Sequence, residues 1–89
     1  MAALNCGILH YEAGRYAAAE TDLRSALKAG ADPATVCYNL ALVYRATHNR
    51  SAALESVAQA LRHNPRSVEA ITLQKTLQAE RQRENLPPR

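Results

Sequence analysis

Apolar residues recur at intervals of three and four along five stretches of the chain, and this spacing predicts five α-helices. In the first stretch, Leu4, Ile8 and Tyr11 form the apolar side. We expect an all-α protein of antiparallel helical hairpins, because the predicted helices follow one another over short connections. The predicted helices cover residues 2–13, 16–29, 34–46, 50–63 and 66–84.

The residues between these stretches are helix-stop and helix-start signals. Gly14 and Gly30 follow the first two helices, where glycine readily takes the left-handed conformation. The third helix is followed by His48-Asn49, and we expect Asn49 to take that role there. Asp32-Pro33 is a predicted cap with proline at the first helical position, and Asn64-Pro65 is predicted to repeat it. The connections therefore support the helix boundaries.

The chain repeats itself with a period of 34 residues and no insertion. A fixed period of this length is typical of stacked repeats, since each unit must offer its neighbour the same face. The fifth helix carries Gln74, Lys75 and Gln78 in this register, where the third has apolar residues, so we expect it to face water on one side. Identical pairs across the repeat are Asn5/Asn39, Ala18/Ala52, Ala19/Ala53, Ala26/Ala60 and Leu27/Leu61.

These residues resemble the tetratricopeptide repeat, although Trp is absent and small residues stand at both Trp positions. The resemblance implies one domain over 1–86: repeats at about 1–33 and 34–67, a capping helix at about 66–84, and a tail at 87–89. It also implies a short right-handed superhelix of five helices. Sel1-like and other helical-hairpin repeats stay as alternatives. The matching residues are Ala3, Cys6-Gly7, His10, Gly14, Tyr16, Ala19, Leu23 and Ala26 in the first repeat, and Cys37, Leu40-Ala41, Tyr44, Ala53, Val57, Ala60 and Pro65 in the second.

The same resemblance implies a concave groove, lined by the first helix of each repeat, that takes an extended peptide or a partner helix. Asn39 would hold a ligand backbone with its amide, and Arg45 would pair with a carboxylate. The places where some family members clamp a chaperone's C-terminal carboxylate carry apolar side chains or threonine here, so an apolar or amphipathic ligand is expected. The expected groove residues are Leu4, Ile8, Tyr11, Glu12, Tyr38, Asn39, Leu42, Arg45, Thr72, Thr76 and Glu80.

Two other kinds of binding stay open. Leu4, Ile8 and Tyr11 could instead be covered by a second copy of the chain or by repeats upstream of it. The net charge of +3 comes from 11 basic and 8 acidic residues, which are spread along the chain rather than clustered. A nucleic-acid-associated domain is therefore the less favoured alternative, and its basic residues would be Arg62, Arg66, Arg81, Arg83 and Arg89.

Catalytic and metal-binding chemistry is weakly indicated. Cys6 and His10 have a spacing that can chelate a metal on a helix, but both fall at positions expected to pack between hairpins. We find no nucleophile–base set and no glycine-rich phosphate loop. We therefore expect no metal site, no cofactor and no enzyme activity, and a protein or peptide as the partner.

Signals for location are also few. Cys6 and Cys37 form no CxxC pair, and two cysteines make no disulfide framework. The run 33–44 is the longest without charge and is too short to span a bilayer. With no secretory start, we expect a cytoplasmic protein without membrane partners. The first helix begins at Met1 with no capping residue before it, as in a piece of a longer chain.

Overall fold

The structure is a computed structural model that describes the backbone of residues 2–85 and the side chains of residues 7–83. The described chain is all-α, as predicted. The fifth helix begins two residues later than expected, and the other boundaries agree to within one residue. The helices are α1 (Ala2–Glu12), α2 (Tyr16–Lys28), α3 (Pro33–Ala46), α4 (Arg50–His63) and α5 (Val68–Asn85).

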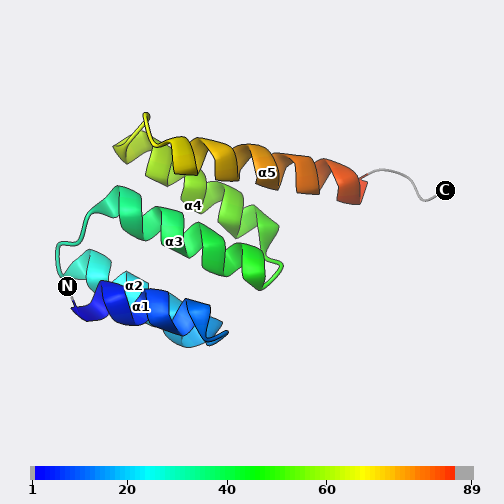
Figure 1. Cartoon of the computed structure of the whole chain (residues 1–89). Coiled ribbons are helices and arrows are strands. Elements are labelled where there is room, and N and C mark those ends of the chain that lie inside the picture. Colours follow the sequence, from blue (N-terminus) through cyan, green and yellow to red (C-terminus); the bar gives the residue numbers. More distant parts are fainter. Residues whose placement is uncertain (1, 86–89) are drawn as a thin grey trace.

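The helices form two layers. Helices α1, α3 and α5 lie at the front of the view in Figure 1, and α2 and α4 lie behind them. The pairs α1–α2 and α3–α4 are hairpins, α2 also packs on α3, and α4 also packs on α5. Each rear helix is therefore held between two front helices. The right-handed superhelix implied by the family resemblance stays a prediction.

The core is built from small and branched aliphatic side chains. One buried cluster joins α2 to α3 and contains Leu23, Val36 and Val43 with several alanines. A second joins α3, α4 and α5, around Val57 and Leu77. Gly7 lets α1 approach α2 closely, since a Cβ atom at this position would stand 2.9 Å from Leu23 Cγ. Small residues thus bring the helix backbones near enough to exclude water.

Three of the connections have the same hydrogen-bonded geometry. After α2, the Ala31 N–H donates to Ala26 O at 2.9 Å and the Gly30 N–H to Leu27 O at 3.2 Å, which is the Schellman motif. The left-handed residue is Gly14 after α1 (φ 80°), Gly30 after α2 (φ 96°) and His48 after α3 (φ 63°). The prediction that Asn49 would take this role was wrong.

Two of the predicted caps also need correction. Asp32 stands at the cap position of α3, but its carboxylate accepts the Thr35 hydroxyl at 2.8 Å rather than a backbone N–H. Asn64 is the C-cap residue of α4, and its side-chain oxygen accepts the Arg66 N–H at 3.3 Å within the turn. Ser67 caps α5 instead, accepting the Ala70 N–H at 3.2 Å. The later cap is why α5 starts at Val68.

A polar link joins the two hairpins. The Tyr44 hydroxyl of α3 donates to Glu20 Oε2 of α2 at 2.6 Å. Arg24 donates both to the same carboxylate, at 3.0 Å, and to the Tyr44 oxygen, at 2.8 Å. Glu20 and Arg24 form an ion pair four residues apart on α2, and Tyr44 extends it across the interface. The Tyr44 hydrogen bond and Arg24 hold the pKa of Glu20 below its usual value.

Candidate partner-binding groove

A groove runs between α3 and α5, which both pack on α4. Its volume is about 380 Å³. Leu73 forms part of the floor and is almost fully buried, while Tyr38 and Leu42 are half-buried along one wall. Val68, 72% exposed, stands on the other wall. We call this the α3–α5 groove; it is lined by Tyr38, Leu42, Arg45, Val68, Glu69, Thr72, Leu73 and Thr76.

One end of the groove opens into a more polar hollow of about 440 Å³ between the N-terminal ends of α3 and α5. Tyr38, Val68 and Glu69 line both spaces, so the two are continuous. Asn39 lies here, and its Nδ2 donates to Thr35 O at 2.9 Å. Within residues 7–83, no group donates to the Asn39 side-chain oxygen, so the amide keeps acceptor capacity for a ligand.

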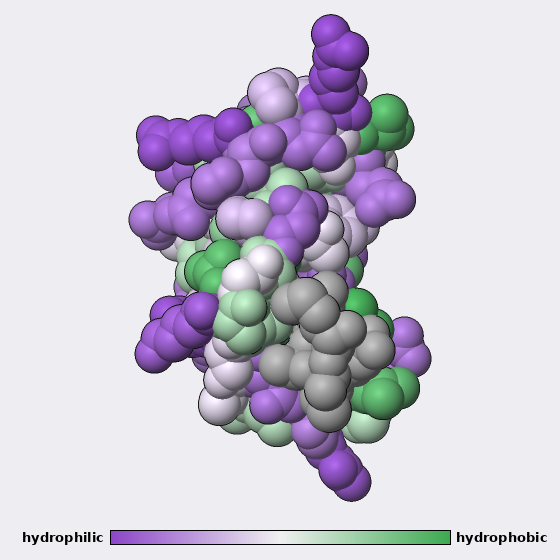
Figure 2. Space-filling model, turned by 90° about the vertical axis from the view of Figure 1, so that its left-hand side faces the viewer, coloured by the Kyte–Doolittle hydropathy of each residue, from purple (hydrophilic) through white to green (hydrophobic). Residues whose placement is uncertain are grey.

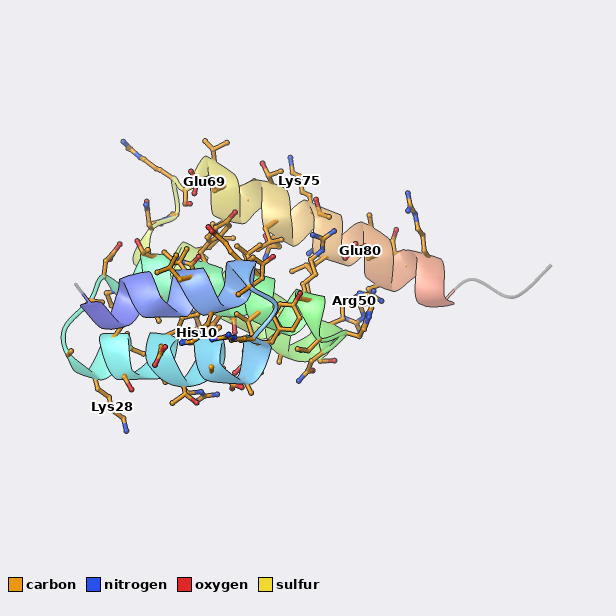
Figure 3. All side chains as sticks on the ribbon, turned by 60° about the horizontal axis from the view of Figure 1, so that its bottom comes forward. His10, Lys28, Arg50, Glu69, Lys75 and Glu80 are labelled. Carbon is orange, nitrogen blue, oxygen red and sulfur yellow. The ribbon has the colours of Figure 1, made fainter. Side chains whose placement is uncertain are left out.

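The other end of the groove opens into a hollow of about 320 Å³ that Tyr11 lines with Leu42 and Arg45. Arg45 makes a two-bond contact with Glu80 of α5, from Nε to Oε1 at 3.1 Å and from a terminal nitrogen to Oε2 at 2.8 Å. Arg50 of α4 approaches the same carboxylate at 3.8 Å. Figure 3 shows Glu80 and Arg50 near one another, far along α5 from Glu69.

The expected pairing of Arg45 with a ligand carboxylate stays a prediction, and in the structure Arg45 is paired with Glu80. Its guanidinium already holds a carboxylate of the same chain with paired hydrogen bonds. The Arg45 bonds hold the pKa of Glu80 below its usual value, so the pair is charged at neutral pH. A ligand carboxylate would therefore have to share Arg45 with Glu80 or displace it. The ion pair instead holds α5 against α3 at this end.

Two tyrosines mark the middle and one end of the groove. Desolvation is the main cause that raises the pKa of Tyr38, and the nearby Glu69 carboxylate adds to it. The Tyr38 hydroxyl therefore stays neutral and able to donate, beside an acidic side chain. Tyr11 packs at the far end against Tyr16 of α2, with ring centroids 5.8 Å apart and planes inclined at 58°. Aromatic side chains thus stand at two points, Tyr38 of α3 within the groove and Tyr11 of α1 in the hollow at its end.

The structure brings together some of the predicted residues and leaves others apart. Tyr38, Leu42, Arg45, Thr72 and Thr76 line the α3–α5 groove, and Asn39 and Tyr11 line the hollows at its ends.

Two predicted residues of the first helix, Ile8 and Glu12, do not join this set. Ile8 is half-buried and Glu12 is exposed, and neither lines the groove or its two end hollows. Leu4 lies outside the described side chains. The candidate surface therefore belongs mainly to α3 and α5 rather than to all three front helices.

Val68, Leu73 and Glu69 line the groove but were missed as site residues. Val68 and Leu73 belong to the apolar spacing that predicts the fifth helix, and this spacing alone does not indicate a groove. The signal that separates them is position. Val68 is the first residue of α5 and is exposed, whereas Ala70 in the same turn is buried against α4.

The metal-binding and basic candidates are dispersed in the structure. His10 Nε2 lies 3.3 Å from Asp22 Oδ2 of α2, and the Cys6 side chain is outside the described set. Figure 3 shows His10 on the side of α1 that faces α2. Across residues 7–83 no three His, Cys, Asp or Glu side chains gather in a metal-binding arrangement. Arg62 and Arg66 flank the α4–α5 turn.

The other arginines lie elsewhere. Arg81 and Arg83 lie toward the opposite end of α5, about 20–22 Å along the helix from its first residue, Val68, at 1.5 Å per residue. Arg89 falls outside the described residues. The arginines proposed for nucleic acid therefore form no single stripe in the part that the structure describes.

Comparison with known proteins adds no family assignment. No protein-family model matches the chain, and no curated protein and no solved structure matches it either. None of the described helices combines the length and hydrophobicity needed to cross a bilayer. The internal repeat and the geometry of the groove are therefore the basis for a functional proposal.

Proposed function

We propose that this chain is a protein-interaction module of the tetratricopeptide type, whose α3–α5 groove binds an apolar or amphipathic peptide or helix. The observation that carries the proposal is the apolar wall and floor of this groove. Tyr38, Leu42 and Leu73 stand between two helices that meet chiefly through α4. Partly exposed apolar side chains gathered in a concave surface are a common mark of a peptide-docking site.

The chemistry along the groove suggests how a ligand would lie. The middle is apolar, so it favours aliphatic or aromatic ligand side chains. The end near Asn39 supplies an amide oxygen for a ligand backbone N–H, beside the carboxylate of Glu69. At the other end the Arg45–Glu80 pair forms a charged wall. A ligand with an apolar centre and polar ends matches this sequence of environments.

A selection experiment tests the proposal. A displayed library of random 15-residue peptides is panned on the wild-type chain, and selected peptides are titrated calorimetrically against wild type and Leu42→Glu. Leu42 lies half-buried at the centre of the groove, so a carboxylate there places charge where the ligand's apolar side chain docks. We expect at least a tenfold loss of affinity, since burying one such apolar side chain is worth about 1.5–3 kcal/mol.

The matched control is Leu27→Glu, which makes the same substitution at an exposed leucine of α2 that lines none of the groove. This variant should bind selected peptides as wild type does. Circular dichroism on both variants checks that helix content is kept. Peptides that bind Leu42→Glu as tightly as wild type, or a panning experiment that enriches no family of peptides, would contradict the proposal.

A further inference from the structure

The 34-residue register places one aliphatic position on each front helix. Leu9 of α1, Val43 of α3 and Leu77 of α5 correspond to one another. Val43 is 2% exposed and Leu77 is fully buried, but Leu9 is 63% exposed. An aliphatic residue at this helical position is thus buried in α3 and α5 but exposed in α1.

The covering element is the same in the two filled cases. Val43 is buried in a cluster with Ala19, Leu23 and Ala26 of α2, the rear helix of the preceding hairpin. Leu77 is buried in a cluster that contains Ala53, Val57 and Ala60 of α4, the rear helix that precedes α5.

In each case a front helix receives a rear helix whose buried residues are alanine, a branched aliphatic residue and alanine at positions i, i+4 and i+7. The internal repeat thus indicates that a helix with this pattern covers the position.

The positions beside Leu9 follow the same register. Val36 and Ala70 are both fully buried, and Ala2 corresponds to them; Leu40 is buried, and Cys6 corresponds to it. The α1 sequence therefore keeps small or apolar residues along the strip that α3 and α5 use for packing. In Figure 2 the surface is mostly hydrophilic, with a few separate hydrophobic areas along its right-hand edge.

We infer that the outer face of α1, centred on Leu9, is a second docking surface that receives an amphipathic helix of another polypeptide. The helix presents small and branched aliphatic side chains in the pattern Ala-x3-Leu/Val-x2-Ala, as α2 and α4 do. This surface is separate from the α3–α5 groove and does not depend on the groove's proposed role.

The described part of the chain favours a foreign helix over a second copy. The two helices with the matching pattern are α2 and α4, and each is already held between two front helices. A second folded copy therefore offers neither of them to α1. A separate amphipathic helix with the same pattern can occupy the position that α2 occupies on α3.

The chain itself supplies the probes. Two fluorescein-labelled synthetic peptides, with the sequences of residues 15–31 and 49–64, are titrated with the 89-residue protein by fluorescence anisotropy. Versions carrying glutamate in place of Leu23 or Val57 serve as control peptides. We expect saturable binding to wild type, at least a tenfold weaker affinity for Leu9→Glu, and an affinity for Leu42→Glu within twofold of wild type.

Each other outcome overturns the inference. Absence of saturable binding to wild type would show that α1 does not receive such a helix. Equal binding to wild type and Leu9→Glu would show that the peptides enter elsewhere, for example by replacing the chain's own α2. If sedimentation showed a dimer that Leu9→Glu dissociates, a second copy would cover the face. Circular dichroism of Leu9→Glu, with Leu9→Ser as a milder variant, confirms that the fold is retained.

Discussion

The contact between Gly7 and Leu23 allows a quantitative test of how the first hairpin is packed. A Cβ atom on residue 7 would lie 2.9 Å from Leu23 Cγ and 3.1 Å from its Cδ2, against about 3.5–4.0 Å for an ordinary carbon contact. Leu23 is fully buried and cannot swing into solvent. We expect Gly7→Ala to cost about 1–3 kcal/mol through overpacking, less the ~1 kcal/mol that alanine gains over glycine in a helix.

The second repeat shows how the same space can be filled differently. Ala41 and Val57 occupy the corresponding positions there and are both fully buried. Compared with Gly7 and Leu23, this pair has one more carbon on the front helix and one fewer on the rear helix. Leu23→Val alone should cost about 1 kcal/mol, by loss of one buried methylene. The double variant should restore the packing, because the alanine methyl occupies the space that the leucine carbon leaves.

The assay is a double-mutant cycle of urea unfolding followed by circular dichroism. We expect the double variant to be at least about 1 kcal/mol more stable than the sum of the single changes predicts, since contacting residues couple by about 0.5–3 kcal/mol. Additivity to within about 0.5 kcal/mol would refute the reasoning. The mirrored pair in the second repeat, Val57→Leu with Ala41→Gly, should show coupling of the same sign.

Two further predictions concern the turn after α3 and the response to acid. His48 holds a left-handed conformation that costs a residue with a Cβ atom about 1–2 kcal/mol. After glycine's own entropy cost, His48→Gly should raise the free energy of unfolding by about 0.5–1 kcal/mol. Urea denaturation measures this change, and an unchanged midpoint would contradict the prediction. The pKa values of Glu20 and Glu80 are lowered on folding from a usual 4.5, so below this pH the unfolded chain binds more protons. The stability that these two carboxylates contribute is thus fully present above about pH 4.5 and is lost as the pH drops through their folded-state pKa values. The free energy of unfolding of Glu20→Gln should therefore decrease less between pH 5 and 3 than that of wild type. Equal decreases would count against the Tyr44 link.

The helices could be predicted from the sequence because two independent periodicities agree. Apolar spacing marks each helix, and the 34-residue shift fixes the register between hairpins. The turns were less predictable, since several residue types satisfy the same backbone geometry. His48 shows this: its φ of 63° is unusual for a residue with a Cβ atom, and the neighbouring Asn49 was the better candidate by preference. Asn49 caps α4 instead, accepting the Ala52 N–H at 3.4 Å.

The candidate site was predictable in outline and not in its polar pairs. Leu42 and Tyr38 were placed on the groove by carrying the groove geometry of the tetratricopeptide repeat, which the chain resembles, onto their positions. Arg45 and Glu80 were also both placed there, but their pairing depends on how α5 lies across α4, which helix periodicity does not report. The Tyr44 link to Glu20 was missed for a similar reason. Both partners lie on separate helices, and the hydroxyl reaches the carboxylate only once the hairpins are stacked.

The way α5 is attached has a consequence for binding strength. Each of α2, α3 and α4 packs substantially on two neighbours, whereas α1 rests chiefly on α2, and α5 chiefly on α4. An element with one main neighbour opens at lower free energy than the rest of a domain, and its amides should exchange first in hydrogen exchange. The α3–α5 groove exists only while α5 is docked. The observed dissociation constant then equals the intrinsic one divided by the docked fraction, so ligand binding and protection of the α5 amides from exchange should rise together.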